Sequence, residues 1–504
     1  MSLKRNVLAN YLSQGWTALM GVAFVPIYIE YLGIEAYGLM GVLVLLQTLL
    51  GLLDLGLSPT LAREMARFRA GAHDEKSIRD LLRSIEVVFA GAATVIALTI
   101  WAASGWLAAN WLRPEKLPPD VVARAFSIMG LIIALRFIEG IYRSTIIGLQ
   151  RQVLLAGITS MIATARGFGA VAVLIWISPT IIAFFIWQVI VSLVSAATLM
   201  LVLYRSIPRS AGGRFSVRAF AGIWRFAFGM LGISALSLIL TQLDKILLSK
   251  FLSLQQYGRY MLASTAAGLL YVIVTPISQA FFPRFSHLSA VGNQGDLAEN
   301  YHKAAQLVTI LVGSAAFMLI AFGDKALYLW THDAVLASKT APMLAVLALG
   351  ALLNCLLWIP YQMQLAHGIV GLAFKSNLIA ILIVIPSLLW VIPRYGGIGA
   401  AWVWAAVNFG YIILNAKLMF RRILSSEQAS WYLKDIALPM TSILVIGVIC
   451  RWGMPEVGKL ASISMLLATT GVLVIGAACS APTVRHALAA LIPRLMRALQ
   501  SRLI

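Results

Sequence analysis

Apolar stretches of about twenty or more residues recur along the whole chain, separated by short polar segments. A helix needs about twenty apolar residues to cross a hydrocarbon layer of roughly 30 Å. The strands of a membrane barrel instead alternate apolar and polar residues over about ten positions, a pattern that these stretches do not follow. With 61% hydrophobic and 12% charged residues among 504, the chain is also too apolar for a soluble core. The sequence therefore predicts an all-α polytopic membrane protein.

The stretches predict about fourteen transmembrane helices, six in each half and a further pair near the C-terminus. The first is preceded by Lys4 and Arg5, is longer than a signal-peptide core and lacks a small-residue cleavage site, so we interpret it as an uncleaved span. The predicted spans are residues 8–32, 37–58, 84–109, 124–149, 153–177, 180–204, 226–250, 257–282, 302–323, 341–366, 370–392, 397–420, 436–452 and 458–480.

Positive charge predicts the orientation, because cytoplasmic loops retain Lys and Arg. With the N-terminus inside, roughly 25 basic residues lie on the cytoplasmic side and roughly 10 outside. An even number of spans then returns the C-terminus to the cytoplasm. The net charge of +20 is explained by this topology and by contact with anionic lipid, and no motif indicates nucleic acid as a partner. The basic tail, residues 483–504, has leucines at helical spacing and is predicted to lie on the inner membrane surface.

The sequence offers no pattern for catalysis or for a bound metal. Cys355, Cys450 and Cys479 lie in apolar stretches without metal-ligand spacing, so neither a disulfide framework nor a zinc site is indicated. No nucleotide-binding loop, HExxH motif or nucleophile–base motif occurs. A membrane-embedded polymerase or ligase would need a sizeable outer loop with catalytic groups, and no predicted outer loop has that length. We therefore expect a protein that is not an enzyme and uses no cofactor.

A short motif is repeated after the first and the seventh predicted spans. Residues 31–38 read Tyr-Leu-Gly-Ile-Glu-Ala-Tyr-Gly and residues 251–258 read Phe-Leu-Ser-Leu-Gln-Gln-Tyr-Gly, an offset of 220 residues. The sixth and twelfth spans match at nearly the same offset, since each ends in Leu-Met. Parallel repeats of this kind build transporters whose substrate site lies between two related bundles. The repeat predicts two six-span lobes in parallel order.

The motifs around these repeats resemble the O-antigen flippase (Wzx-like), or polysaccharide transporter, family. This family is part of the superfamily of multidrug, oligosaccharidyl-lipid and polysaccharide exporters. In order and spacing the motifs cover nearly the whole chain. They are Leu-Gly-x-x-x-Tyr-Gly at 32–38, Asp-Leu-Gly-Leu-Ser-Pro-Thr-Leu-Ala-Arg-Glu at 54–64, Gly-Leu-Gln-Arg at 148–151, Gln-Leu-Asp-Lys at 242–245, and Tyr-Gly-Gly-Ile-Gly-Ala-Ala at 395–401.

The resemblance implies two six-helix lobes around a central cavity, at 1–210 and 211–425, followed by two extra spans and a basic cytoplasmic tail at 426–504. It also implies export of an undecaprenyl-pyrophosphate-linked oligosaccharide across a bacterial inner membrane. The implied partners are this lipid-linked substrate and membrane lipids, with a polysaccharide polymerase and glycosyltransferases as further candidates. Peptidoglycan lipid-precursor flippases share the fold but carry an arginine-rich first span, whereas this first span has no arginine beyond Arg5.

Ionisable residues inside spans are costly, so each is a candidate for function. Arg136, Glu139 and Arg143 in the fourth span follow steps of three and four, which places them on one helical face. The fifth span adds Arg166. Because guanidinium groups suit phosphate oxygens, we predict that Arg136 and Arg166 line a substrate cavity. The alternative is that Arg136 and Glu139 form a structural pair that only holds the fourth span.

The remaining candidates are Asp54, Arg63, Arg67, Asp244 and Lys245. Asp54 lies near the cytoplasmic end of its span, where snorkelling or capping is the favoured explanation. Arg63 and Arg67 are candidates for catching an incoming pyrophosphate, although charge that sets the topology is favoured for them. Asp244 and Lys245 are about 100° apart on a helix and are not expected to face the same way. An ion pair between lobes explains these two as well as a substrate contact does.

One further function stays open on the sequence. A drug or metabolite exporter of the same fold would carry organic cations and would favour acidic and aromatic residues in its cavity. Here the basic residues inside spans at least equal the acidic ones. The balance of charge therefore favours an anionic substrate.

Overall fold

The computed structural model describes residues 3–54, 56–69, 71, 74–207, 215, 236, 238–369, 371–453 and 458–486. Over these ranges the chain is helical almost throughout and contains no strand. Within the described residues, eleven helical stretches are long and apolar enough to cross a membrane. The prediction of an all-α polytopic membrane protein is therefore confirmed.

Two of these eleven helical stretches are interrupted by a glycine. Val25–Asp54 has a break at Gly33, with φ +84°, and Phe374–Phe420 has one at Gly396, with φ +59°. Glycine adopts positive φ without the steric cost that other residues meet. Both breaks fall where the sequence predicts a turn between consecutive spans, so each stretch holds two helical segments. Residues 226–235 of the predicted seventh span lie outside the described residues.

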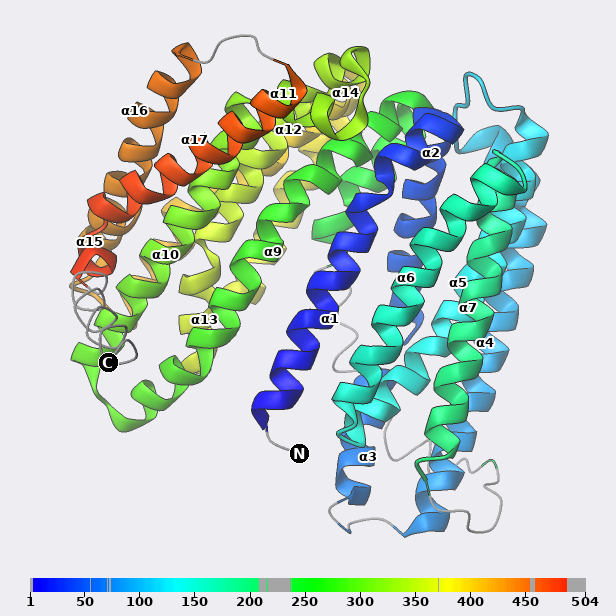
Figure 1. Ribbon diagram of the computed structural model, residues 1–504. Helices are drawn as coiled ribbons and strands as arrows, with labels where there is room; N and C mark the ends of the chain where they lie inside the picture. Colours follow the sequence, from blue (N-terminus) through cyan, green and yellow to red (C-terminus); the bar gives the residue numbers. More distant parts are fainter. Residues whose placement is uncertain are drawn as a thin grey trace, which may run out of the picture. The chain divides into compact units, whose positions relative to one another are not determined.

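The chain divides into two compact units, unit 1 at Met1–Met261 and unit 2 at Leu262–Ile504. In unit 1, α5 packs between α4 and α7, and α1 packs against α6 (Figure 1). The predicted lobe boundaries at residues 210 and 425 stay predictions. The elements of unit 1 are α1 (Leu3–Ala23), α2 (Val25–Leu50), the 3-10 turn η1 (Gly51–Asp54), α3 (Leu57–Arg69), α4 (Glu75–Asn110), α5 (Pro119–Gly148), α6 (Gln152–Trp176), α7 (Ile181–Tyr204) and a helix at 238–251.

The short helix α3 packs onto the end of α5, and this contact explains one of the sequence motifs. Gly148 lies so close to α3 that a Cβ atom there would collide with the backbone of Ala62. Arg69 donates a hydrogen bond from Nη1 to the carbonyl oxygen of Leu149 at 2.7 Å. Gln150 then turns the chain toward α6 with φ +56°. The Gly-Leu-Gln-Arg motif is therefore a packing and turning element.

The two repeated octets contact each other within unit 1. Gly38 and Gly258, the last residues of each octet, meet so closely that a Cβ atom on either one would collide with backbone atoms of the other octet. Glu35 in the first octet accepts hydrogen bonds from the backbone N–H groups of residues 115 and 116 at 2.7 and 2.9 Å. Close backbone packing therefore requires glycine at the end of each octet.

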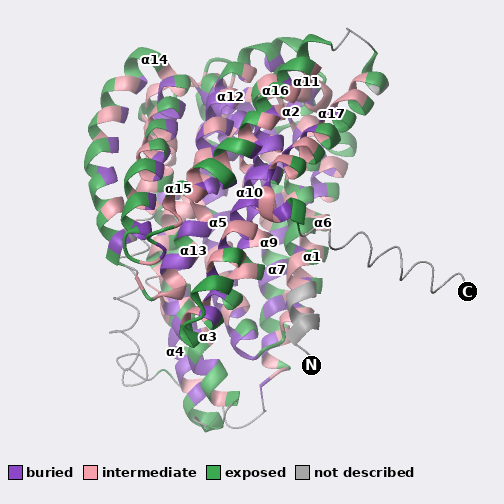
Figure 2. Cartoon of the chain, turned by 90° about the vertical axis from the view of Figure 1, so that its left-hand side faces the viewer, coloured by how far each residue is buried: buried purple, intermediate pink, exposed green. Residues whose placement is uncertain are grey.

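Unit 2 is built around α10, which is buried along much of its length (Figure 2). Its core joins α10 to α12 and α14 on one side and to α16 and α17 on the other. The elements are α9 (Leu254–Val291), which begins in unit 1, α10 (Gln294–Ala321), α11 (Gly323–Thr331), α12 (Ala334–Leu356), α13 (Trp358–Ala366), α14 (Gly371–Phe420), α15 (Gln428–Ser430), the π-helical segment η2 (Trp431–Ala437), α16 (Leu438–Trp452) and α17 (Lys459–Ser480). Residues 487–504, most of the predicted tail, lie outside the described residues.

Local sequence explains where several helices begin. Thr180, Asn293 and Asp333 precede α7, α10 and α12, and each side-chain oxygen accepts a hydrogen bond from the backbone N–H three residues later, at 3.3, 3.1 and 2.9 Å. Such caps satisfy N–H groups that have no partner within the helix. Large apolar side chains stay exposed on the helices, for example Trp176 at 82% and Trp452 at 89%. This is the surface expected of helices that face lipid.

Candidate functional site

The candidate site lies in unit 1 around Arg136, near the middle of α5. Its guanidinium donates three hydrogen bonds, to Oε1 of Gln47 at 2.8 Å, Oε1 of Gln188 at 3.1 Å and Oγ of Ser192 at 3.4 Å. Gln47 belongs to α2, and the other two belong to α7. These three acceptors are all uncharged. The positive charge of Arg136 is therefore held by neutral oxygen atoms, which fix its position without neutralising it.

The carboxylate on the same face of α5 pairs with a different arginine. Nη2 of Arg143 lies 2.8 Å from Oε1 of Glu139, and Nη1 of Arg143 donates to Oγ1 of Thr159 on α6 at 3.3 Å. Glu139 is buried, whereas Arg143 remains partly exposed. The structural pair on α5 is thus Glu139 with Arg143, four residues apart. The alternative pairing of Arg136 with Glu139 does not form.

Arg166 on α6 brings a third guanidinium to this place. Its Nε atom is buried and has no hydrogen-bond partner among the described residues. Arg166 interacts electrostatically with Arg136, Arg143 and Glu139. We call Arg136, Arg143 and Arg166, together with Glu139, the arginine cluster. The cluster has three guanidinium groups and one carboxylate. Its excess positive charge makes the cluster chemically suited to bind an anion such as phosphate.

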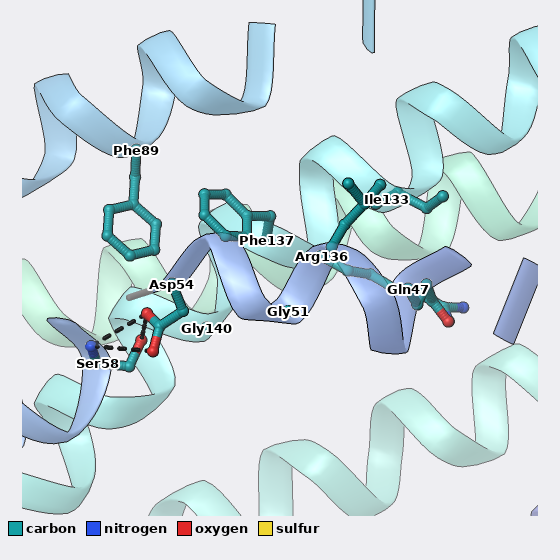
Figure 3. Close-up of a pocket in the computed structure, with 10 residues that line it drawn as sticks. Gln47, Gly51, Asp54, Ser58, Phe89, Ile133, Arg136, Phe137 and Gly140 are labelled. Atoms are coloured by element: carbon teal, nitrogen blue, oxygen red, sulfur yellow. Dashed lines mark hydrogen bonds between the residues drawn. The ribbon is translucent and has the colours of Figure 1, made fainter. Parts of the chain in front are cut away.

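A pocket of about 190 Å³ opens beside Arg136 (Figure 3). Two aromatic rings form part of its wall, those of Phe89 and Phe137, which stack with their centroids 4.6 Å apart. Pockets for drug-sized ligands enclose about 300–1,000 Å³, so this one has room for a smaller group. The lining residues are Gln47, Leu50, Gly51, Asp54, Ser58, Phe89, Ile133, Arg136, Phe137 and Gly140.

Asp54 lines the same pocket but its carboxylate is turned toward the start of α3 (Figure 3). Oδ1 accepts hydrogen bonds from the backbone N–H of Ser58 at 3.1 Å and from its hydroxyl at 2.6 Å. Because α3 begins at Leu57, these bonds satisfy one of its free N–H groups. Asp54 therefore makes the capping contact, and it lies near the arginine cluster as well.

Arg63 and Arg67 share a buried acidic partner on α3. Nη2 of Arg63 lies 2.7 Å from Oε1 of Glu64, and Nη1 of Arg67 lies 3.2 Å from Oε2. The Glu64 side chain is only 2% exposed, whereas those of Arg63 and Arg67 are 44% and 54% exposed. Both arginines therefore contact one buried carboxylate on their own helix, and their part in catching a pyrophosphate stays a prediction.

Asp244 and Lys245 lie in the helix at 238–251 and contact each other. Nζ of Lys245 lies 3.9 Å from Oδ1 of Asp244 and donates a hydrogen bond to the carbonyl oxygen of Thr241 at 3.2 Å. The hydroxyl of Tyr260 on α9 donates to Oδ2 of Asp244 at 2.5 Å. The two charged groups approach each other because the long lysine side chain bends back along its own helix. The difference in their directions and the ion pair between lobes stay predictions.

A second and larger cavity, of about 550 Å³, lies between α1, α5 and α6. It adjoins the arginine cluster, because Arg143 belongs to both. The lining residues are Asn10, Ser13, Gln14, Thr17, Ala18, Arg143, Ile147, Gln152, Leu155, Ala156 and Thr159. More than half of them have polar side chains, although the cavity is built from helices that are mostly apolar.

Sequence reasoning missed the uncharged polar residues of both pockets. Gln47 and Gln188 hold Arg136 in place, and Gln14 lines the larger cavity. A search for charged residues alone passes over such side chains. These residues could have been found as amide side chains inside apolar spans, because polar groups at membrane depth need partners from other helices.

Comparison with known proteins finds relatives that are named as transporters. Its sequence is 21% identical over 425 residues to a Shigella flexneri protein named "Putative O-antigen transporter", covering 83% of this chain and 97% of that protein. It is 28% identical over 227 residues to the succinoglycan biosynthesis transport protein ExoT of Rhizobium meliloti strain 1021, covering 42% of each chain. Both relatives carry the names of transport proteins. The resemblance to polysaccharide transporters is therefore confirmed.

Solved structures share the fold. The lipid II flippase MurJ in an inward closed conformation matches with a TM-score of 0.70 and 14% identity, covering 94% of this chain and 98% of that one. An inward-facing MATE multidrug transporter matches with a TM-score of 0.63 and 14% identity, covering 84% of this chain and 96% of that one. The family described as polysaccharide biosynthesis protein matches residues 3–289, more than half of the sequence. The chain therefore belongs to the polysaccharide biosynthesis protein family, and it shares its fold with MurJ and a MATE transporter.

Proposed function

We propose that this protein is a flippase that moves an undecaprenyl-pyrophosphate-linked oligosaccharide from the cytoplasmic to the outer leaflet of a bacterial inner membrane. The observation that carries the proposal is the arginine cluster, whose three guanidinium groups outnumber its one carboxylate. Guanidinium groups bind phosphate oxygens through paired hydrogen bonds. The names of the O-antigen and succinoglycan relatives support the same class of substrate.

The membrane potential supplies a driving force for such a substrate. Moving one elementary charge across the membrane is worth about 2.3 kcal/mol per 100 mV. A headgroup with two negative charges that moves outward from a negative interior therefore gains about 4 to 5 kcal/mol per 100 mV. Arg136 and Arg166 shield this headgroup during the crossing, while the polyprenyl tail stays in lipid.

The proposal includes alternating access between two six-span lobes, within fourteen spans and with both termini in the cytoplasm. The contact between Gly38 and Gly258 supports it, because the two repeated octets close on each other without side chains between them. We take this contact to be the outer closure of an inward-facing state. Cysteines introduced at Tyr37 and Gln256 and then cross-linked should stop export without unfolding the chain. Full export with the cross-link formed contradicts the closure.

The proposed topology has a separate test. A cysteine at Ser178, between α6 and α7, should react with an impermeant maleimide from outside intact cells. One at Gln294, the exposed first residue of α10, should react only after the membrane is opened. Gln294 is preferable to its neighbour Asn293, because Asn293 caps α10. Labelling of Gln294 in intact cells contradicts the topology.

The function itself is tested by deleting the gene in its host. Saccharide-bearing polyprenyl pyrophosphates should then accumulate where an impermeant glycosidase added to spheroplasts does not reach them. Expression of the wild-type protein should restore access to the enzyme. Unchanged access in the deletion strain would overturn the proposal.

Two alternatives share the fold. A small-molecule exporter is favoured by the structural likeness to a MATE transporter, and a peptidoglycan lipid-precursor flippase by the likeness to MurJ. In the first case deletion sensitises the host to organic cations and leaves lipid-linked saccharides unchanged. In the second case deletion stops growth, because the peptidoglycan precursor no longer reaches the outer leaflet.

A further inference from the structure

A stripe of uncharged polar side chains runs along α1, the helix that begins the first predicted span. Asn10, Ser13, Gln14 and Thr17 follow the spacing i, i+3, i+4, i+7, so they share one face of α1. All four line the cavity of about 550 Å³ between α1, α5 and α6. A polar stripe inside a membrane helix is unfavourable unless its groups find hydrogen-bond partners.

The stripe falls into two parts. Ser13 donates to the carbonyl oxygen of Ala156 at 3.0 Å, and Asn10 donates to Oε1 of Gln152 at 3.4 Å, so these residues bind α1 to α6. Gln14 and Thr17 are exposed in the cavity and have no hydrogen-bond partner within the described ranges. Helix packing therefore explains the first part of the stripe and leaves the second part unexplained.

The opposite wall connects the cavity to the arginine cluster. Gln152, Thr159 and Arg166 follow steps of seven on α6, which places them on one face of that helix. Gln152 and Thr159 line the cavity. Arg143 lines it too, and it donates to Thr159 at 3.3 Å while it pairs with Glu139 at 2.8 Å. A ligand in the cavity is therefore within reach of the groups that suit phosphate.

The size and the chemistry of the cavity fit a sugar. Its volume of about 550 Å³ lies within the range of about 300–1,000 Å³ that is usual for small-molecule pockets. Amide and hydroxyl groups supply both donors and acceptors, as sugar hydroxyl groups require. No carboxylate and no aromatic ring is among the lining residues. In a lipid-linked saccharide the first sugar is bonded directly to the pyrophosphate, so a sugar site must adjoin the phosphate site.

We propose that the cavity between α1, α5 and α6 binds the saccharide residue next to the pyrophosphate. Gln14 and Thr17 bind its hydroxyl groups, and Arg143 lies between the sugar and the phosphate. This inference rests on the proposed function and deepens it, since it explains how the protein selects a loaded carrier over bare undecaprenyl pyrophosphate. A site built to bind hydroxyl groups rejects a ligand that lacks them, because its own polar groups then stay unpaired.

The test is a binding measurement on the purified full-length protein with two probes. One probe is the saccharide-bearing polyprenyl pyrophosphate pool extracted from the host that lacks this gene, and the other is undecaprenyl pyrophosphate. The variant Gln14→Leu/Thr17→Val removes the polar groups and keeps the side-chain volume. It should bind the saccharide-bearing probe about tenfold more weakly, as expected for the loss of one or two neutral hydrogen bonds. Its affinity for undecaprenyl pyrophosphate should not change.

Two further variants keep the test decisive. Thr17→Trp fills the cavity without touching the bonds between α1 and α6, and it should give the same selective loss. Thr94→Val is the matched control, because Thr94 is exposed on α4 and its hydroxyl bonds only to its own helix at Ala90. It should bind both probes as the wild type does.

The outcomes separate this inference from the proposed function. If the wild type prefers the saccharide-bearing probe and both cavity variants lose that preference, the sugar site is supported. If the cavity variants bind both probes like the wild type, the sugar site is overturned and the flippase function stands. Wild-type protein that binds neither probe overturns the flippase function and the sugar site with it.

Discussion

The two compact units hold buried charge in opposite ways. In unit 1, neutral side chains hold Arg136, and Nε of Arg166 has no partner among the described residues. In unit 2, His302 lies between two carboxylates. Its Nδ1 atom is 2.5 Å from Oδ2 of Asp435, and its Nε2 atom is 3.1 Å from Oε2 of Glu427.

Further hydrogen bonds complete the arrangement in unit 2. Gln306 donates to the other oxygen of Asp435 at 2.8 Å and to the hydroxyl of Thr483 at 3.2 Å, and it accepts from the backbone N–H of Val484 at 3.0 Å. We call His302, Gln306, Glu427 and Asp435 the histidine network. It joins α10 to η2 and to the residues that follow α17.

The two arrangements of charged groups suit different roles: one stabilises the fold, and the other binds a ligand. A buried polar network whose members satisfy one another rigidifies the structure around it. A cluster with excess charge and an unused donor is costly in a membrane protein, and it is expected where a ligand completes it. The comparison therefore predicts that the histidine network supports stability and that the arginine cluster supports transport.

The largest effect is expected from the arginine cluster. Arg136→Ala and Arg166→Ala should each lower saccharide export at least about tenfold, because a hydrogen bond to a charged group contributes about 1.5–3 kcal/mol. The double variant should abolish export. Export is measured in the gene-deleted host, with the amount of protein in the membrane determined for every variant.

Two companions refine this prediction. Arg136→Lys keeps the charge but loses the planar donor geometry, so export well below wild type indicates bidentate phosphate contact. Arg136→Leu/Glu139→Leu should stay inactive, because Glu139 pairs with Arg143 and not with Arg136. Restored export in this double variant would return Arg136 to a purely structural role.

The next largest effect is expected on stability in unit 2. Asp435→Ala leaves His302 without its nearest partner and Gln306 without an acceptor. Removing one member of a buried pair costs about 3–5 kcal/mol, so the variant should unfold at a clearly lower temperature in detergent. Export per folded molecule should stay near wild type. Loss of export by a protein of unchanged stability argues against a structural role.

Glycine contacts provide a smaller, paired comparison. Gly38→Ala in unit 1 introduces a methyl group into the contact between the octets, and Gly447→Ala in unit 2 introduces one against the ring of Phe317. Overpacking of this kind costs about 1–3 kcal/mol where the contact is permanent. Gly447→Ala should therefore lower the thermal midpoint and spare export. Gly38→Ala should lower export and spare the midpoint, because under the proposed alternating access its contact forms in only one state of the cycle.

The smallest effect is expected at the surface of α3. Arg63→Gln and Arg67→Gln each leave Glu64 one arginine partner. Each arginine is about half exposed, and the buried Glu64 keeps its other arginine partner, so each variant should keep stability and export close to wild type. A strong export defect in either single variant would move these arginines into the path of the substrate.

Much of the fold was predictable because membrane helices follow simple rules of length and composition. The breaks at Gly33 and Gly396 fall between predicted spans, where a turn needs a residue that tolerates positive φ. Helical periodicity also placed Arg136, Glu139 and Arg143 on one face of α5, since spacing along a helix fixes direction.

Pairing among these charges was not predictable. Glu139 lies three residues from Arg136 and four from Arg143, and both spacings allow a contact. Arg136 bonds instead to Gln47 and Gln188, which are 89 and 52 residues away in the sequence, and Glu139 is left to pair with Arg143.

The histidine network shows the same limit. His302 and Asp435 are separated by 133 residues, and no local pattern connects them. Long-range partners of this kind follow from packing between helices, which a single sequence does not specify.

The central claim is that the arginine cluster, and not the histidine network, binds the phosphate-bearing headgroup. The most direct measurement is the affinity of purified protein for undecaprenyl pyrophosphate, compared among the wild type, Arg136→Ala/Arg166→Ala and Asp435→Asn. Affinities are expressed per folded molecule. The arginine variant should bind at least about tenfold more weakly than the wild type, and the Asp435 variant should bind equally well. Unchanged binding by the arginine variant, or a loss confined to Asp435→Asn, would contradict the claim.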